Sequence, residues 1–288
     1  MKIRISCIIS LSLSGLFGKD NFSITEFSLP SEVSTVFIED WNGNGRKDIL
    51  VLTDSLWYIY FQSHDGWKPE NADLVFPPPQ AAIVYDFGNV DDKSDNELVY
   101  FSTAGVFKVK IGSPNSEPIL LFKTKTLFDQ FHDSLSKKED GFSGMRFTFL
   151  MEFKKGKTDI VVPTLEGFEI WERNETFQFS HKLGGVGSRE IKSLNAVGIS
   201  GVYTINNYRL IDVNKDGEKE FMFNNDDHFS IYLKNPSTQS PEKLDIPFPE
   251  TLLKKSKKEK PATISKLEDI NNDGVVDIVA TKIATQSL

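Results

Sequence analysis

The chain has 288 residues, of which 39% are hydrophobic and 26% charged. This composition is typical of a globular protein and excludes wholesale disorder, a collagen-like fibre and a coiled-coil rod. The 33 basic and 41 acidic side chains give a net charge of −8. Because so acidic a protein lacks the positive field that nucleic acid binding requires, we expect no nucleic acid partner.

Residues 1–18 have the pattern of a secretory signal peptide. Two basic residues near the N-terminus precede an apolar run that ends at Phe17 and is too short to span a bilayer. A buried N-terminal strand is the alternative interpretation. Cleavage would leave residues 19–288 as a secreted or exported chain without a transmembrane segment, in the extracellular space, at the cell surface or in the periplasm. It would also remove Cys7, the single cysteine, so we expect no disulfide in the mature protein.

Three loops along the chain share a nine-residue pattern. An acidic residue stands at positions 1 and 9, asparagine at position 3, asparagine or aspartate at position 5 and glycine at position 6. The full copies are Asp40–Asp48, Asp212–Glu220 and Asp269–Asp277. Of two degenerate copies, Asp86–Asp92 reaches a final acid, Glu97, only after extra residues, and Met151–Asp159 lacks the early polar positions. A spacing of about 57 residues indicates a repeat architecture with about five units.

We expect strands on both sides of each loop, because short runs of β-branched and aromatic residues alternate there with turn-forming residues. The strand pairs after the loops are predicted at Asp48–Asp54 with Leu56–Gln62, Glu97–Thr103 with Val106–Ile111, Asp159–Leu165 with Phe168–Trp171, and Phe221–Asn225 with Phe229–Leu233. The fold class is therefore all-β. The segment Phe22–Leu29 could complete the last sheet beside Asp277–Ile283 and close the repeats into a ring without free edges.

The oxygen-bearing side chains of the nine-residue loops predict calcium sites. Oxygen ligands at positions 1, 3, 5 and 9 of a tight turn suit a hard cation, and calcium tolerates irregular geometry better than magnesium does. Simple turns between strands are the alternative interpretation of such Asp/Asn/Gly clusters. The candidate ligands are Asp40, Asn42, Asn44, Asp48, Asp212, Asn214, Asp216, Glu220, Asp269, Asn271, Asp273 and Asp277.

The three loops are not expected to bind calcium equally, because the charge of a site tunes its affinity. The Asp40 loop has two carboxylates and also contains Arg46 and Lys47. The Asp269 loop has three carboxylates and no basic residue within it. We therefore predict that the Asp269 loop binds calcium most tightly and the Asp40 loop least tightly.

The recurring loop between apolar strands resembles the FG-GAP/VCBS repeats, whose best-known relatives are the integrin α-subunits. The resemblance covers essentially all of residues 19–288. It implies a β-propeller of four-stranded blades, with calcium in the loops that join the first two strands of a blade. At this length the propeller would have about five blades.

No catalytic constellation emerges from the sequence. The four histidines stand in no metal-ligand spacing, and no nucleophile elbow or phosphate-binding loop is present. The resemblance therefore implies a calcium-binding, non-catalytic binding or adhesion module for a protein or a glycan. An enzyme acting on polysaccharide and an assembly scaffold for another chain remain as alternatives, and the oligomeric state is undefined. Specificity could lie in the inserts Ser113–Ser143 and Asn235–Pro261, or in Trp41, which could stack on a sugar.

Overall fold

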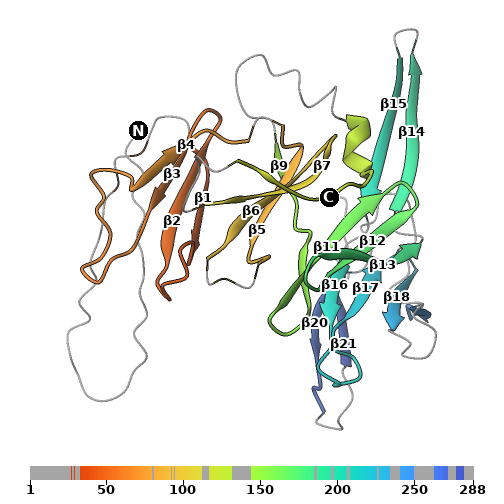
Figure 1. Cartoon of the computed structure of the whole chain (residues 1–288). Coiled ribbons are helices and arrows are strands. Elements are labelled where there is room, and N and C mark those ends of the chain that lie inside the picture. The colour runs from red at the N-terminus through yellow and green to blue at the C-terminus, as the bar shows by residue number, and fades with distance from the viewer. Residues whose placement is uncertain are drawn as a thin grey trace, which may run out of the picture. The chain divides into compact units, whose positions relative to one another are not determined.

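The structure is a computed structural model of the chain (Figure 1). It describes residues 27, 29, 33–79, 81–91, 93, 95–111, 117–131, 144–184, 187–195, 198–205, 208–225, 227–233, 241–249, 263–271 and 277–281. Of these, 130–131, 187–195, 198–205, 263–268 and 280–281 are described by their backbone alone. The predicted signal peptide, Asp273 and much of both inserts lie outside this part of the chain. The chain divides into two compact units, residues 1–147 and 148–288, which are described separately.

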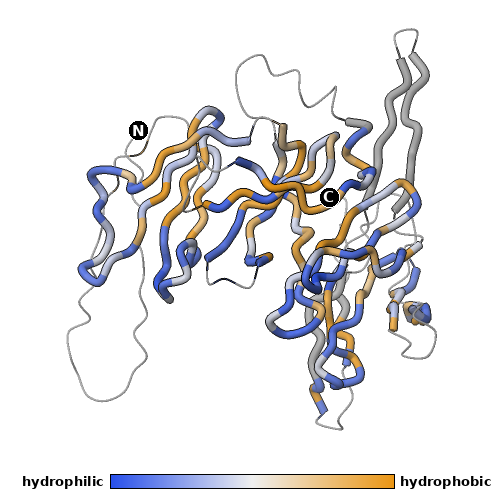
Figure 2. The backbone as a smooth tube through the Cα atoms, viewed as in Figure 1, coloured by the Kyte–Doolittle hydropathy of each residue, from blue (hydrophilic) through white to orange (hydrophobic). Residues whose placement is uncertain are grey.

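The first sheet of unit 1 is an antiparallel meander of four strands. In order, these are β1 (Val33–Glu39), β2 (Asp48–Thr53), β3 (Trp57–Tyr60) and β4 (Leu74–Phe76). Strand β2 is buried along its whole length, and the hydrophobic residues that follow Asp48 lie between two neighbouring strands (Figure 2). A central strand that is buried on both faces has apolar residues on both faces. This is why apolar and polar residues do not alternate along β2.

The second sheet of unit 1 repeats the meander and adds a short fifth strand. It consists of β5 (Val84–Gly88), β6 (Glu97–Ser102), β7 (Gly105–Lys110) and β8 (Ile119–Phe122), with β9 (Met145–Arg146) parallel to β5 at the edge. A 3₁₀ helix, Leu127–Phe131, follows β8. Gly105 has a φ of 138° in the tight turn that joins β6 to β7, a conformation that favours glycine.

Aromatic side chains hold the two sheets of unit 1 together. The indole of Trp57 lies 5.4 Å from the ring of Tyr85, and Trp41 lies 5.0 Å from Phe87. Trp41 is only 2% exposed, so it is a core residue and our suggestion that it stacks on a sugar is wrong. Large buried aromatic rings of this kind dominate the energetics of a core.

Unit 2 contains two further four-stranded antiparallel sheets. The first is β10 (Leu150–Lys154), β11 (Lys157–Thr164), β12 (Gly167–Arg173) and β13 (Phe177–Gly184). The second is β16 (Tyr208–Ile211), β17 (Glu220–Asn224), β18 (His228–Leu233) and β19 (Glu242–Pro247). Phe168 of one sheet packs against Phe221 and Phe223 of the other, with ring centroids 5.6 and 5.5 Å apart.

Two hairpins complete the described part of unit 2. They are β14 (Gly187–Asn195) with β15 (Gly198–Ile205), and β20 (Thr263–Glu268) with β21 (Asp277–Thr281). The β20–β21 hairpin flanks the Asp269 loop as predicted, whereas the β14–β15 hairpin was not anticipated.

The all-β fold class and all four predicted strand pairs are confirmed, with ends that differ by one or two residues. No sheet closes on itself within the described residues. Ring closure stays a prediction, since Phe22–Glu26 and Lys282–Ile283 are not described. None of the described residues forms a helix long and apolar enough to cross a membrane.

Candidate metal-binding loops

The first loop, between β1 and β2, is held by its own backbone. Asp40 accepts hydrogen bonds from the amides of Asn44 (3.1 Å to Oδ1) and Gly45 (2.7 Å to Oδ2). The Asn42 Oδ1 accepts from the Asn44 amide at 3.0 Å, and the Asn44 Oδ1 from the Arg46 amide at 2.8 Å. Each of the three early ligand positions therefore has an oxygen whose direction is fixed by a backbone N–H.

The final acid of this loop is the buried end of strand β2. Asp48 is 0% exposed, and its two oxygens accept from the amides of Trp41 (2.9 Å) and Gln62 (2.8 Å). Burial raises the pKa of Asp48 above its usual value, and the nearby charge of Asp40 adds to this rise against the two backbone hydrogen bonds. A cation beside the two carboxylates would relieve both effects.

The loop between β16 and β17 repeats these hydrogen bonds position by position. Asp212 accepts from the amides of Asp216 (3.1 Å) and Gly217 (2.9 Å), and the Asn214 Oδ1 accepts from the Asp216 amide at 3.0 Å. The Asp216 Oδ1 accepts from the Glu218 amide at 2.8 Å. The sequence alignment of the two loops is therefore also a structural alignment.

Positions 2, 4 and 9 of this loop also match those of the Asp40 loop. The Val213 amide donates to Glu220 Oε2 at 2.8 Å, as Trp41 does to Asp48 in the first loop. Lys215 takes a left-handed φ of 60° at position 4, where the first loop has Gly43 with a φ of 73°. Burial also raises the pKa of Glu220. Both loops thus end in a buried acid that favours a nearby positive charge.

The third full loop, between β20 and β21, is described only at its ends. The Ile270 amide donates to Asp277 Oδ2 at 2.9 Å, which again links position 2 to position 9. Lys215 of the preceding loop places its Nζ 3.2 Å from Asp269 Oδ2. A basic group therefore reaches this loop from outside its own nine residues, which the charge count within the loop could not reveal.

The degenerate copy in the second sheet has a different register from the one predicted. The Val90 amide donates to Glu97 Oε2 at 2.9 Å, the same link between positions 2 and 9. Position 1 is therefore Asn89 rather than Asp86, which lies within β5, and no residues are inserted. The spacing of Val90 from Glu97, equal to that of Trp41 from Asp48, was the signal that could have identified it.

The copy in the third sheet has become a short hairpin between β10 and β11. Its final acid, Asp159, is 3% exposed and accepts from the Arg173 amide at 2.8 Å, as Asp48 does from Gln62. The ammonium group of Lys157 approaches Asp159, with Nζ 4.0 Å from Oδ1.

The loops also connect neighbouring sheets within each unit. In unit 1, Asn96 donates from its side chain to the Asp40 carbonyl (2.7 Å) and from its amide to the Trp41 carbonyl (3.3 Å). In unit 2, the Lys219 amide donates to the Phe153 carbonyl at 2.7 Å. Asn96 and Lys219 both stand at position 8 of their loops, so each loop is tied to the loop of the preceding sheet.

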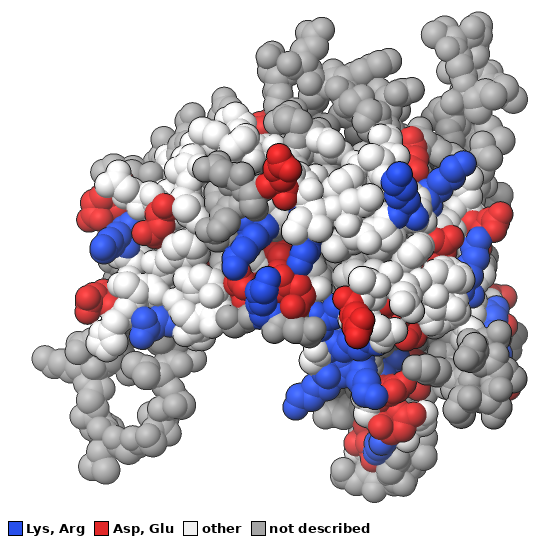
Figure 3. All heavy atoms as spheres, in the orientation of Figure 1, with Lys and Arg blue, Asp and Glu red and all other residues white. Residues whose placement is uncertain are grey.

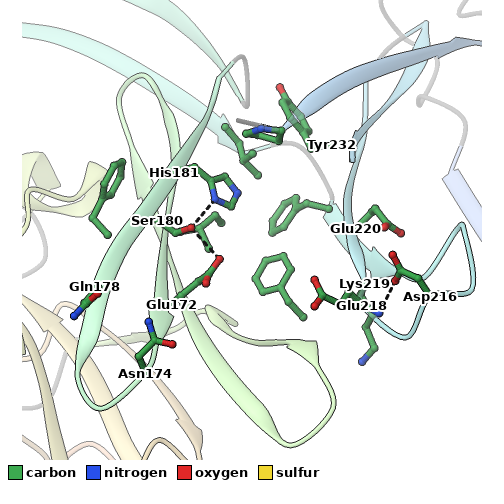
Figure 4. A pocket seen from close by; sticks show the side chains of 16 residues that line it. Glu172, Asn174, Gln178, Ser180, His181, Asp216, Glu218, Lys219, Glu220 and Tyr232 are labelled. Atoms are coloured by element: carbon green, nitrogen blue, oxygen red, sulfur yellow. Dashed lines mark hydrogen bonds between the residues drawn. The ribbon is translucent and has the colours of Figure 1, made fainter. Parts of the chain in front are cut away.

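A cavity of about 420 Å³ lies in unit 2 beside the Asp212 loop (Figure 4). One wall comes from β12 and β13, where the Ser180 hydroxyl donates to Glu172 Oε1 at 2.8 Å. The opposite wall carries Asp216, Glu218 and Glu220 of the loop. Its four carboxylates outnumber the single lysine of the lining, so the cavity disfavours an anionic ligand.

Acidic and basic side chains of the described residues lie interspersed on the face shown in Figure 3, without a continuous basic surface there. No group of three or more acidic, histidine or cysteine side chains in the described part of the chain is arranged to hold a metal. Calcium sites of the predicted kind also draw on amide and backbone oxygens, and the first loop has two carboxylates and two asparagines. The donor chemistry of the loops therefore fits a hard cation.

A scan against protein-family models and a search of curated proteins found no match to this chain. The resemblance to the FG-GAP/VCBS repeats consequently rests on the loops and on the strands around them.

Proposed function

We propose that the protein is an exported, calcium-binding repeat protein of the β-propeller type that acts as a non-catalytic binding module. The observation that carries the proposal is the set of matched hydrogen bonds in the Asp40 and Asp212 loops. A mere turn needs only one or two such bonds. The retention of side-chain oxygens at all four positions in both loops is better explained by a shared ligand.

Calcium is the ligand that this arrangement favours. The loop oxygens come from carboxylates and amides, which are hard donors, and an irregular turn suits a cation that accepts six to eight ligands. The buried acids Asp48 and Glu220, whose pKa values are raised by burial, supply charge that a divalent cation would neutralise. With Asp40, Asn42, Asn44 and Asp48 in one loop and their counterparts in the other two, calcium would hold together the two strands that flank each of these three loops.

The cavity beside the Asp212 loop is the place where we expect the ligand of the module to bind. Its lining combines apolar side chains, among them Phe153 and Phe221, with acids and amides. Apolar faces with a few polar groups are the usual composition of a ligand pocket. A hydroxyl-rich or basic group of a glycan or protein would match this lining, and calcium in the loop would fix the wall that holds Asp216.

Isothermal titration calorimetry of the purified protein with calcium and with magnesium tests the proposal. We expect calcium binding that is lost in part in Asp40→Ala and in Asp212→Ala. The exposed Asp65, which lies outside the loops, provides the matched control Asp65→Ala, which should bind as the wild type does. Binding of calcium that is equal in all four proteins, or absent from the wild type, would contradict the assignment.

A further inference from the structure

The loop of the second sheet, Asn89–Glu97, keeps two hydrogen bonds of the first loop, one from position 2 to position 9 and one from position 5 to position 3. The Asn89 Oδ1 accepts from the Asp91 amide at 3.3 Å, and the Asp91 Oδ1 from the Lys93 amide at 3.2 Å. The bond from Lys93 to Asp91 joins positions 5 and 3, as the bond from the Asn44 amide to Asn42 Oδ1 does in the first loop, whereas the bond from Asp91 to Asn89 joins positions 3 and 1. Glu97 closes the loop and is 2% exposed. The loop has an asparagine at position 1, acids at positions 3 and 9 and a lysine at position 5.

A second lysine enters this loop from a strand. Lys108 stands on β7, where it pairs with Val99 of β6, and its side chain is 14% exposed. Its Nζ lies 2.9 Å from Asp91 Oδ2 and 3.8 Å from Glu97 Oε1. The ammonium group thus lies between the acids of positions 3 and 9, which are the positions that hold the cation in our assignment of the other loops.

This arrangement differs from an ordinary surface ion pair. Exposed ion pairs contribute little to stability because water screens their charges. Lys108 and both of its acidic partners are instead largely buried. A buried carboxylate without a positive partner is costly, so the loop requires a cation at this place. The sheet register fixes the backbone of Lys108, so the charge is supplied by the strand and not by the loop.

We propose that Lys108 takes the place of calcium in the second sheet, which is therefore stable without the metal. The inference rests on the proposed function, in which the other loops require calcium. The two sheets of unit 1 therefore differ in their dependence on calcium. Removal of calcium destabilises the sheet of β1–β4 and leaves the sheet of β5–β9 intact.

Hydrogen exchange of the wild-type protein, in calcium and in chelator, tests this directly. At a calcium concentration about 100 times the Kd, a strand that depends on the ion should exchange about 100-fold faster when calcium is removed. We expect this response for amides of β1–β2 and β16–β17 and no response for β6–β7. If β6–β7 responds as strongly as β1–β2, the inference is wrong. If no strand responds, the proposed function is wrong.

A pair of variants tests the role of the ammonium group itself. Lys93→Asn combined with Lys108→Met restores an oxygen at position 5 and removes the internal cation, so it should bind one calcium ion more than the wild type. Lys110→Met is the matched control, because Lys110 lies on the same strand but pairs with Asp95 outside the ligand positions, at 2.6 Å. It should leave the calcium stoichiometry unchanged. A double variant with the stoichiometry of the wild type would overturn the inference.

Discussion

Lys215 has two separate effects that substitution can resolve. It holds a left-handed φ of 60° where the first loop has glycine, and its Nζ lies 3.2 Å from Asp269 Oδ2. The left-handed conformation costs a residue with a side chain about 1–2 kcal/mol. Glycine avoids this cost but loses roughly 0.4–1 kcal/mol through the entropy of the unfolded chain. In chelator, Lys215→Gly should therefore be more stable by about 0.5–1 kcal/mol than a variant that loses the charge of Lys215 but keeps a side chain in this conformation.

The ammonium group of Lys215 also competes with calcium for Asp269. An ion pair this exposed is worth about 1 kcal/mol at most, so its loss should raise the calcium affinity of the Asp269 loop up to about fivefold. Lys215→Gln removes the charge but keeps the side chain in the left-handed conformation. We expect both variants to raise the affinity, and the glycine variant to have the higher melting temperature of the two in chelator.

Calorimetry and thermal unfolding measure these two effects independently. A melting temperature in chelator that is about 1–3 °C higher for Lys215→Gly than for Lys215→Gln would agree with the argument. An unchanged or weaker calcium affinity in both variants would refute the competition between Lys215 and calcium. Equal stabilities of the two variants in chelator would refute the argument from backbone strain.

Three further predictions concern single positions. Gly167 has a φ of 142°, and a Cβ there would lie 1.9 Å from the Leu183 carbonyl oxygen, so Gly167→Ala should lower the free energy of unfolding by about 3 kcal/mol or more. Gly184→Ala, where a Cβ would meet nothing within 4 Å, is the control, and equal melting temperatures would contradict the argument. Asp48→Ala leaves the buried amide of Trp41 and the half-buried amide of Gln62 without their acceptor and should cost about 2 kcal/mol or more even in chelator, as urea unfolding would measure. Burial raises the pKa of Glu97 to about 7, so its contribution to stability should fall as pH rises from about 4.5 to 7 and be absent from Glu97→Gln. Parallel pH profiles of the two proteins would exclude this contribution.

The direction of that pH dependence follows from the burial of Glu97, which outweighs the opposing charge of Lys108. Burial favours the protonated form of Glu97, and its pKa in the folded protein exceeds the usual value near 4.5. Folding is therefore favoured most at low pH, where the group is protonated in both states, and loses this benefit as pH passes the folded pKa. The ammonium of Lys108 has one charge and is closer to Asp91, whose pKa it holds down against the effect of burial.

The strands and the full loops could be predicted because their signals are local. Runs such as Ile49–Leu52 and the Asp/Asn/Gly pattern of each loop specify strand and turn without reference to distant residues. The register of the second copy was missed because the copy was aligned by residue type, with the acid Asp86 placed at position 1. The hydrogen bond that defines the loop depends instead on the spacing between Val90 and Glu97.

The features that could not be predicted depend on contacts between distant parts of the chain. Lys108 reaches its loop because β7 pairs with β6 in one particular register. Trp41 is buried by Phe87 of the neighbouring sheet, although its place within a polar loop suggested exposure. Lys215 meets Asp269 across two consecutive repeats. Tertiary packing determines each of these contacts, and no local pattern contains them.

Thermal unfolding of the protein in excess chelator, in millimolar calcium and in millimolar magnesium tests the central claim most directly. A ligand bound only by the folded state raises the melting temperature, by an amount that grows with its concentration relative to Kd. The account predicts a clear rise with calcium and a smaller one with magnesium, because the loops suit a cation that tolerates irregular coordination. Equal melting temperatures in all three conditions would show that the loops are turns alone and would contradict the account.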